Sequence, residues 1–391
     1  MSMRKEKVLI ISPFYFPEPI STGKFNTFLV NALKDRTKDI VVLCSHPFYP
    51  DWKVEQHENE STDVQIIRGG RNIIYPKHST LRRMILELWF SFFVLRKFFK
   101  LRNEIDIIIE VFPPSLVFFF LRFFINKRTK IVGMVHDLQE VYALNKSGIF
   151  NKLVGFFINK IEGQAMKSCD KLIFLSNEMK TIAQSYYKLN NEKLAVQYPF
   201  ITLDVEYSTN NLGHLLPSDK KHIVYSGGLG EKQSPDQLYA LFDYTSNRLK
   251  DTWFHFFSQG PIFNELKASN KNEKIQFHCL VDSSNLLELY QKSSIQIIPQ
   301  EPGTSIGSLP SKLPNILVSG CRSLVITDKD SELDLLFQKY NLNTVATCWD
   351  NKMLFSNLKK IIDSKEGEDS HQVKVAKKLF NIDNHIDEIL A

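Results

Sequence analysis

Short runs of apolar residues alternate with amphipathic segments along almost the whole chain. The runs are rich in Ile, Val and Phe and nearly continuous, which is typical of strands whose two sheet faces are both covered. Between them apolar residues recur at helical spacing, for example over 23–34 and 81–102. This alternation predicts an α/β protein with parallel sheets. Strands are expected within 7–14, 39–46, 64–69, 105–112, 130–137, 171–176, 222–229, 252–260, 275–281, 295–300, 323–328 and 343–348.

The chain divides into two halves of similar plan. At 391 residues it is too long for one hydrophobic core, so two domains are expected. Residues 208–221 are polar, contain Gly and Pro and lack a period, which predicts a linker. We therefore place an N-terminal domain at 1–205 and a C-terminal domain at 206–375. An amphipathic helix is predicted from about 372 to 390, and its part in 376–391 is a candidate to pack back on the N-terminal domain.

Composition and charge exclude several classes of function. The net charge of +6 is modest, and no basic run interleaved with Gly or aromatic residues indicates a nucleic-acid partner. The five cysteines are scattered without a CxxC pair, which argues against a zinc site or a disulfide framework and is typical of the reducing cytoplasm. The first residues lack a signal-peptide pattern. Charges interrupt the apolar segments 84–99 and 113–128, and neither reaches the roughly 20 residues that span a bilayer.

Two turns in the second half have the composition of an anion site. The first, VYSGGLGEKQSP, carries three glycines that let backbone amides approach a ligand, and a lysine. The second, SLPSKLP, places a serine and a lysine at an expected helix start. Because both turns follow strands of one domain, we expect them to face one cleft and to bind a diphosphate; solvated surface lysines are the alternative. The residues concerned are Gly227, Gly228, Gly230, Lys232, Ser311 and Lys312.

Two turns in the first half are further candidates. In SPFYFPEPISTGKF, Gly23 and Lys24 stand just before a predicted helix, where ligand contact and a plain structured turn are equally good interpretations. His136 and Asp137 directly follow the fifth predicted strand, where an imidazole can bond a sugar hydroxyl and a carboxylate can accept a proton. The alternative is that Asp137 only caps the next helix. No strand is followed by GxGxxG, which argues against a nicotinamide or flavin dehydrogenase.

A DxD pattern, Asp328 and Asp330, is a weak metal candidate. It follows a late strand without partner carboxylates or histidines, and its composition is typical of a solvated helix start. We therefore expect no metal and no other cofactor.

Several segments resemble, in the same order, those of retaining glycosyltransferases of family 4 with the GT-B fold. The similar branch is the bacterial one that builds capsule, O-antigen and colanic-acid repeats. The segments are SPFYFPEPISTGKF, HPFYPDWKV, HDLQ, FLSNEMK, VYSGGLGEKQSPDQL, FFSQGP, LLELYQKSSIQIIPQ and LPSKLPNILVSGCRSLVIT.

The resemblance implies two Rossmann-like domains that face a central cleft. It implies a nucleotide-diphosphate sugar donor, with a UDP-sugar favoured, held by the second domain. The first domain would hold a polyprenyl-diphosphate-linked or other saccharide acceptor. Transfer of a hexosyl type would proceed with retention and without a metal. Lys232, Ser311 and Lys312 match donor-diphosphate positions, and charge on the leaving diphosphate would be offset by the lysines. Gly23 matches a loop near the donor, and His136 matches a histidine near the transferred sugar. Gln259 and Gly260 match a turn that lines the nucleotide part of the donor site.

The chain also departs from the family pattern. Gly228 stands where many members have Arg, and Gly307 and Asn315 stand where many have a pair of glutamates. Asn315 could still bond the ribose as a neutral amide. Two alternatives therefore stay open: a non-catalytic subunit that binds a nucleotide sugar beside a partner enzyme, and a sugar-nucleotide 2-epimerase.

The predicted helix at 81–102 clusters basic residues around Trp89 and several Phe. Such a helix could lie on an anionic membrane and meet a lipid-linked acceptor; an ordinary packing helix is the alternative. The expected location is cytoplasmic and peripheral on the inner face of the membrane. The basic residues are Arg82, Arg83, Arg96, Lys97, Lys100 and Arg102.

Overall fold

The computed structural model describes residues 6–18, 20–57, 63–138, 149–305, 309–342, 344–364 and 369–391. Its contacts divide the chain into two compact units, Met1–Gln197 with Ile382–Ala391, and Tyr198–Asn381. The division thus falls at 197, where the sequence suggested 205, and the end of the chain belongs to the first unit. Each unit is an α/β fold with a parallel sheet, as predicted.

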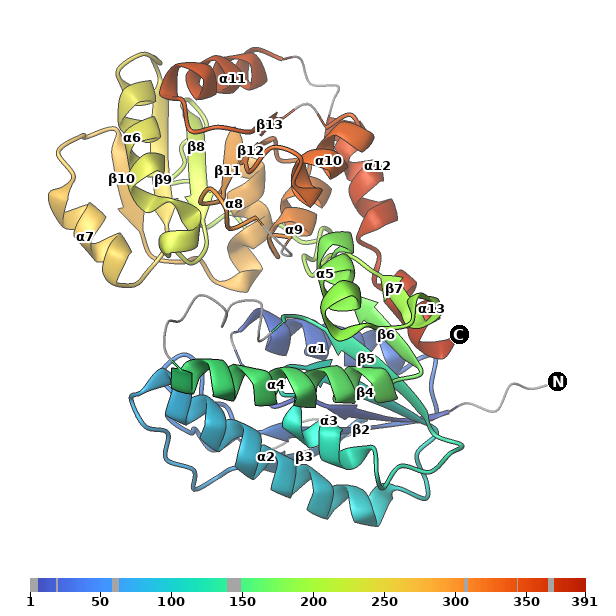
Figure 1. Ribbon diagram of the computed structural model, residues 1–391. Coiled ribbons are helices and arrows are strands. Elements are labelled where there is room, and N and C mark those ends of the chain that lie inside the picture. Colours follow the sequence, from blue (N-terminus) through green and yellow to red (C-terminus); the bar gives the residue numbers. More distant parts are fainter. Residues whose placement is uncertain are drawn as a thin grey trace. The chain divides into compact units, whose positions relative to one another are not determined.

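The first unit is built on a seven-stranded sheet in the order β3-β2-β1-β4-β5-β6-β7, with all neighbours parallel (Figure 1). Order reverses between β1 and β4. Its strands are β1 (Lys7–Ile11), β2 (Asp39–Ser45), β3 (Gln65–Gly69), β4 (Ile107–Phe112), β5 (Lys130–Val135), β6 (Lys171–Phe174) and β7 (Leu194–Val196). Its helices are α1 (Ser21–Leu33), α2 (Ser79–Leu101), α3 (Leu116–Leu121), α4 (Ile149–Ser168), α5 (Asn177–Tyr187), the 3-10 turn η1 (Asn191–Lys193) and α13 (Ile382–Leu390).

Both faces of this sheet are covered, which explains the continuous apolar strands. Alternate residues such as Leu9 and Ile11 of β1 join one buried cluster with side chains of α2, α3, α4 and α5. Helices α1 and α13 contact one another, and each buries an apolar face. The predicted strands are correct in place but too long: the ranges for β1, β2, β5 and β6 included residues of the following turn, and those for β3 and β4 began one or two residues early. The three-residue strand β7 was missed because it is short and only half-buried.

The second unit is built on a six-stranded parallel sheet in the order β10-β9-β8-β11-β12-β13. Order reverses between β8 and β11. Its strands are β8 (Lys221–Ser226), β9 (Thr252–Phe257), β10 (Ile275–His278), β11 (Ile295–Pro299), β12 (Ser323–Ile326) and β13 (Val345–Ala346). Its helices are α6 (Pro235–Ser246), α7 (Pro261–Ser269), α8 (Leu286–Lys292), α9 (Leu313–Val318), α10 (Glu332–Lys339), α11 (Asn351–Asp363) and α12 (Asp369–Leu379), with 3-10 turns η2 (Glu231–Gln233) and η3 (Ser283–Asn285).

Two local predictions were wrong. Residues 208–221 are not a free linker, because Leu212 and Leu216 are buried against the second unit. The carboxylate of Glu288 accepts hydrogen bonds from the backbone N–H of Asn211 at 2.7 Å and of Leu212 at 2.8 Å, which pins this polar stretch. The single predicted C-terminal helix is two helices, α12 and α13, which belong to different units.

Three histidines form a hydrogen-bonded row across β8, β9 and β10. The Nδ1 atom of His222 lies 2.9 Å from Nε2 of His255, and Nδ1 of His255 lies 3.1 Å from Nε2 of His278. Burial lowers the pKa of His255 to about 2 and that of His278 to about 4. The row is therefore neutral near pH 7; both ring nitrogens of His255 bond neighbouring strands, and Nε2 of His222 bonds the backbone oxygen of Pro217 at 2.8 Å.

Glu110 in β4 is a fully buried carboxyl group in the first unit. Cys169 Sγ donates to its Oε2 atom at 3.5 Å, and Oε1 has no hydrogen-bond partner among the described residues. Burial raises the pKa of Glu110 to about 8. The folded protein therefore keeps this carboxyl protonated over a pH range where the unfolded chain has lost the proton.

We predict that Glu110→Gln stabilises the first unit increasingly as pH rises from 5 to 8. Between the unfolded pKa and the raised folded pKa, the folded state holds one proton more than the unfolded state, so the free energy of unfolding falls by up to about 1.4 kcal/mol per pH unit. Glutamine keeps the shape and removes this dependence. Urea unfolding at pH 5, 6.5 and 8 measures it; exposed Glu104→Gln serves as the control. Parallel curves for wild type and Glu110→Gln would contradict it.

Candidate functional site

The second unit contains a cavity of about 370 Å³ at the carboxyl ends of β8 and β11. These strands are neighbours, and the order of the sheet reverses between them, which is where open α/β sheets bind ligands. Turns from both strands line the cavity, so the two predicted anion turns meet in one place. The lining residues are Tyr225, Ser226, Gly227, Gly228, Lys232, Gln233, Phe257, Leu280, Val281, Leu286, Leu289, Tyr290, Ile298, Pro299, Gln300, Thr304, Pro310, Ser311 and Lys312.

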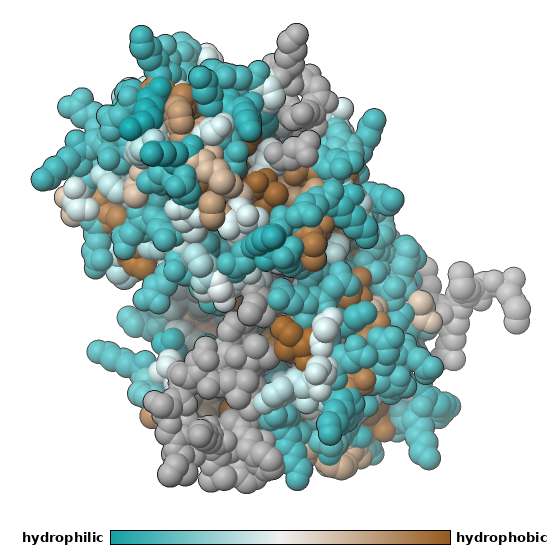
Figure 2. All heavy atoms as spheres, turned by 45° about the horizontal axis from the view of Figure 1, so that its top comes forward, coloured by the Kyte–Doolittle hydropathy of each residue, from teal (hydrophilic) through white to brown (hydrophobic). Residues whose placement is uncertain are grey.

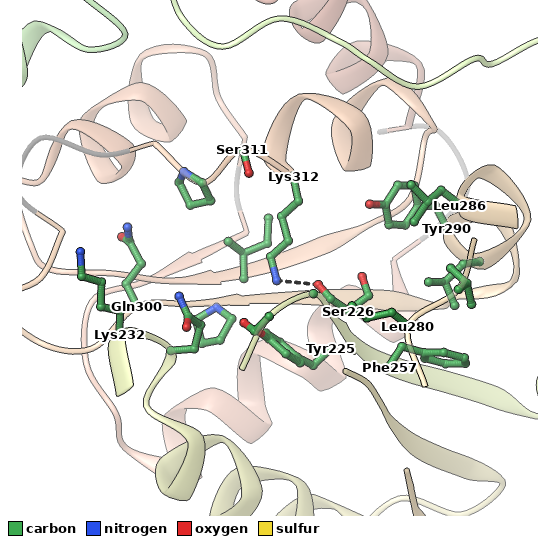
Figure 3. A pocket seen from close by; sticks show the side chains of 18 of the residues that line it. Tyr225, Ser226, Lys232, Phe257, Leu280, Leu286, Tyr290, Gln300, Ser311 and Lys312 are labelled. Atoms are coloured by element: carbon green, nitrogen blue, oxygen red, sulfur yellow. Dashed lines mark hydrogen bonds between the residues drawn. The ribbon is translucent and has the colours of Figure 1, made fainter. Parts of the chain in front are cut away.

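Lys312 precedes α9 and extends its side chain across the cavity toward the end of β8 (Figure 3). Its Nζ atom donates a hydrogen bond to the backbone oxygen of Ser226 at 3.0 Å and lies 4.1 Å from the ring centroid of Tyr225. Burial lowers the pKa of Lys312 to about 7. An anion placed beside this amine would favour its charged form and would itself be bound by it.

The glycine turn after β8 is shaped around this lysine. Gly227 has φ of 130°, a conformation that residues with a side chain rarely adopt. A Cβ atom there would also lie 3.8 Å from Nζ of Lys312. The hydroxyl of Tyr225 donates to the backbone oxygen of Gly228 at 2.5 Å, so one tyrosine supports both the turn and the lysine. The N–H of Gly227 donates to Phe257 oxygen at 3.0 Å, so this glycine ends the strand without placing a side chain beside the amine.

The loops after β8 and β11 are tied to one another. The backbone N–H of Glu301 donates to the oxygen of Lys232 at 2.8 Å, and Ser234 Oγ donates to the carboxylate of Glu301. Asp328 holds the same loop from the other side, because it accepts from Gly303 N–H at 2.9 Å and from Ser305 Oγ at 2.6 Å. Asp328 therefore anchors a loop, and the prediction that it starts a helix was wrong: α10 begins later, at Glu332.

The cavity has a cationic end and an apolar end. Figure 3 shows Lys232 and Gln300 on one side of Lys312, and Phe257, Leu280 and Leu286 on the other. Lys232 is exposed at the mouth of the glycine turn. A ligand that carries phosphate groups on one part and a flat, weakly polar group on another would match both ends.

Gly230, predicted for the diphosphate turn, and Gln259 and Gly260, predicted for the nucleotide side, are not among the lining residues of this cavity. Gly230 donates its N–H to Gln233 Oε1 at 3.0 Å and shapes the turn η2. Gln259 is exposed, and Gly260 with φ of 108° begins α7. Gly307 lies outside the described residues.

Asn315 is buried in α9 and its side chain serves the chain itself. Its Oδ1 atom accepts from Thr202 N–H at 2.9 Å and Leu203 N–H at 3.1 Å, and its Nδ2 donates to Thr202 Oγ1 at 3.0 Å. This amide therefore fastens the segment that opens the second unit. The predicted ribose contact stays without support from this geometry, since both ends of the amide already have partners.

The candidates of the first unit lie at the carboxyl edge of its own sheet. Gly23 and Lys24 belong to the first turn of α1, which begins at Ser21 rather than after Gly23. Gly23 is buried where a Cβ atom would lie 2.8 Å from Cβ of Glu18, so the glycine permits close packing of the preceding loop. Lys24 is exposed.

His136 and Asp137 follow β5, as predicted. The ring of His136 meets the edge of Phe25 at 4.6 Å, and its Nε2 atom is buried with no hydrogen-bond partner among the described residues. Burial lowers the pKa of His136 to about 4, so the imidazole is neutral at pH 7. Asp137 is exposed, and its Oδ1 accepts from Leu138 N–H at 2.9 Å. The helix-cap alternative for Asp137 concerns residues outside the described ranges.

No group of three or more His, Cys, Asp or Glu side chains in the described ranges is placed to hold a metal ion. Sequence reasoning missed Tyr225, Tyr290, Gln300 and Thr304, which supply much of the cavity wall. Tyr225 and Gln300 could have been found, because they stand at the carboxyl ends of two predicted strands beside the chosen turns. Tyr290 comes from the buried side of α8, and no local pattern indicates its place.

Comparison with known proteins finds a family model that matches part of the chain and a curated relative that matches most of it. The family model described as Glycosyltransferase Family 4 matches residues 24–205. A curated relative, WcaI of Escherichia coli (strain K12), a glycosyl transferase assigned to colanic acid biosynthesis, is 25% identical over 363 residues. The similarity covers 85% of this chain and 86% of that relative. These findings confirm the family resemblance predicted from the motifs.

Solved structures show the fold. Sucrose-phosphate synthase from Thermosynechococcus elongatus has a TM-score of 0.72 at 14% identity, covering 99% of this chain and 98% of that one. WaaG, a glycosyltransferase involved in lipopolysaccharide biosynthesis, has a TM-score of 0.69 at 13% identity. The similarity covers 98% of this chain and 99% of that one. The predicted GT-B fold class, with two parallel-sheet domains, is confirmed.

We predict that the affinity of the cavity for a nucleoside diphosphate falls above pH 7. With the pKa of Lys312 at about 7, the free amine must take up a proton when the anion binds, which weakens binding up to about tenfold per pH unit. The terminal phosphate of the ligand has already lost its second proton by then. Calorimetry between pH 7 and 9, in buffers of different ionisation enthalpy, measures affinity and proton uptake. Lys312→Arg stays charged and should remove the slope; a persistent slope would assign it to another group.

Proposed function

We propose that the protein is a glycosyltransferase of family 4, whose family model matches residues 24–205, and that it transfers a glycosyl group from a nucleotide-diphosphate sugar, with a UDP-sugar favoured. The acceptor is a polyprenyl-diphosphate-linked or other saccharide in bacterial surface polysaccharide assembly, a role supported by the relative assigned to colanic acid biosynthesis. The observation that carries the donor assignment is the meeting of Lys232 and Lys312 in one cavity at the reversal point of the second sheet.

The shape and charge of the cavity suit such a donor. Its volume of about 370 Å³ lies within the range of small-molecule sites. We assign the diphosphate to Lys312, Lys232 and the backbone N–H of Gly228, because the charge of the two lysines and the turn that contains Gly228 line the same cavity. The base and ribose then belong at the apolar end near Phe257 and Leu280. The diphosphate would replace Ser226 oxygen as the main partner of the Lys312 ammonium.

The reaction that we assign breaks the bond between the anomeric carbon and the diphosphate oxygen. A bond from an acceptor hydroxyl oxygen to the same carbon forms with retention of configuration, and the hydroxyl proton is released. Negative charge grows on the leaving diphosphate during this step. Lys312 becomes fully protonated beside that charge and stabilises it most when it is largest, together with Lys232. Two fixed cations can supply the charge for which many transferases use a divalent metal.

The acceptor belongs to the first unit in this proposal. Asp137 is exposed at the carboxyl edge of the first sheet and is assigned to ordering the acceptor hydroxyl. His136 is neutral at pH 7 and adjoins it, so it contributes a polar but uncharged wall near the transferred sugar. A lipid-linked acceptor implies work at the cytoplasmic face of a membrane, with peripheral attachment.

We expect one nucleoside diphosphate to bind selectively, with UDP the expected one, and Lys312→Ala to weaken that binding by about tenfold to a hundredfold. Loss of a charge-assisted hydrogen bond to phosphate predicts this size. Thermal shift and ligand-observed NMR with UDP, GDP, CDP and ADP measure it, each in EDTA and in magnesium.

Lys339→Ala is the control, because the ammonium of this exposed lysine also lies over a tyrosine ring, 5.5 Å from the centroid of Tyr340, but Lys339 does not line the cavity. Equal effects of the two substitutions, or binding that requires magnesium, would contradict the donor assignment.

Turnover distinguishes this function from its alternatives. With the donor identified, wild type should release the nucleoside diphosphate only when a saccharide acceptor is present, and NMR of the product should show the anomeric configuration of the donor. Selective binding without turnover would favour a non-catalytic partner subunit. Change at C2 of the donor sugar without transfer would favour an epimerase.

A further inference from the structure

Helix α2 and the end of α3 present large apolar side chains to solvent. Leu88 is 60% exposed, Phe92 70% and Phe123 63%. By comparison, the face drawn in Figure 2 is largely hydrophilic, with hydrophobic side chains in small separate groups. We call the following set the α2–α3 face: Leu81, Met84, Leu88, Phe92, Phe99, Phe120, Phe123 and Phe124.

The exposed residues of α2 follow helical spacing, and so do its buried ones. Leu81, Met84, Leu88 and Phe92 recur every three or four residues and are exposed. Leu86, Phe90, Val94 and Phe98 recur in the same way and are buried in the first unit. An ordinary surface helix has one apolar stripe, which faces the core. Helix α2 has a second stripe that no described part of the chain covers.

The second stripe is continuous with α3. Helices α2 and α3 pack together along their length, and the rings of Phe99 and Phe124 meet edge to face at 4.9 Å. Beyond that contact, Phe123 extends the apolar surface past the end of α3. Exposed apolar surface that is gathered on adjacent helices marks an interaction site far more often than single exposed residues do.

Cations border the α2–α3 face. Arg96 and Lys100 are exposed beside the stripe, and the guanidinium of Arg102 lies over the ring of Phe99 at 5.3 Å. The one acidic residue of α2, Glu87, is turned to α3, where its carboxylate accepts from Leu116 N–H at 3.0 Å and Ser115 N–H at 3.3 Å. The surface is therefore apolar with a positive border.

We propose that the α2–α3 face inserts into the surface of an anionic lipid bilayer. Apolar side chains that flank basic ones on a helix are what the boundary between headgroups and acyl chains accommodates. A second copy of this chain fits less well, because symmetric pairing would bring the same arginines and lysines face to face. The inference adds the mode of attachment to the proposed function, from which it takes only the lipid-linked acceptor.

This mode differs from the one that the sequence suggested. Trp89, expected at the centre of the membrane contact, is half-buried and donates from Nε1 to the hydroxyl of Tyr75 at 2.9 Å. Arg82 lies over the ring of Trp52 at 4.4 Å, within the unit's own aromatic cluster. Phe92 and its neighbours, and not Trp89 with Arg82, form the outward surface.

The test uses the full chain and the variant Leu88→Ser/Phe92→Ser, which leaves every cation in place. Both positions are exposed, so folding should be retained, as thermal unfolding can verify. Wild type should co-sediment with vesicles of phosphatidylcholine and phosphatidylglycerol, and the variant should bind about tenfold or more weakly. Raising the salt concentration should reduce the residual vesicle binding of the variant, because that binding comes only from the attraction of its cations to anionic lipid, which salt screens. Leu335→Ser/Tyr207→Ser, which removes a leucine and an aromatic of similar exposure from the second unit, should bind like wild type.

Equal vesicle binding by Leu88→Ser/Phe92→Ser and wild type would overturn the inference. So would a wild-type dimer in sedimentation that the variant dissociates without any vesicle binding, which would assign the face to a second copy. Nucleoside diphosphate binding, measured on the same samples, separates this inference from the proposed function. Vesicle binding that depends on Leu88 and Phe92 supports insertion even if no nucleotide binds.

Discussion

The site of the second unit depends on the contacts that the amine of Lys312 makes inside the protein. The amine is drawn out of water onto the ring of Tyr225 and the backbone oxygen of Ser226, at the point where two neighbouring strands end. Burial has brought the pKa of Lys312 to about 7, so its amine is only partly protonated at neutral pH. The conformation of Gly227 and the ties between the flanking loops all keep space open beside this amine. The site is thus prepared for negative charge before any ligand arrives.

Buried side-chain acceptors organise the loops around both sheets. The carboxylate of Glu18 accepts a hydrogen bond from the N–H of Phe48 at 2.7 Å, and that of Glu87 accepts one at the start of α3. Glu288 accepts hydrogen bonds from the segment before β8, and Asn315 from the segment after Gln197. Each of these groups turns a polar stretch, which could not otherwise be buried, into part of a unit. The same use explains why Asn315 is absent from the cavity wall.

Helix α2 carries two apolar stripes, one that faces the core of the first unit and one that faces solvent. The buried stripe completes the core beneath β1, β2 and β4. The opposite stripe, which is centred on Phe92, is exposed to solvent. In the described ranges no helix is both long enough and apolar enough to span a bilayer. A helix that lies along a lipid surface needs neither, because its apolar side chains enter only the boundary region.

The sequence by itself determined the α/β class, the two parallel sheets and the turns that carry the lysines, because apolar runs, glycines and charges are local and periodic. It also sufficed to expect Lys232 and Lys312 together, since parallel strands end at one edge of a sheet. Only the tertiary structure decided which side of α2 faces out, since both of its stripes are apolar. Long-range contacts likewise packed residues 208–221 against the second unit, where a free linker was predicted, and engaged the side chain of Asn315, because Glu288 and Thr202 are far from their partners along the chain.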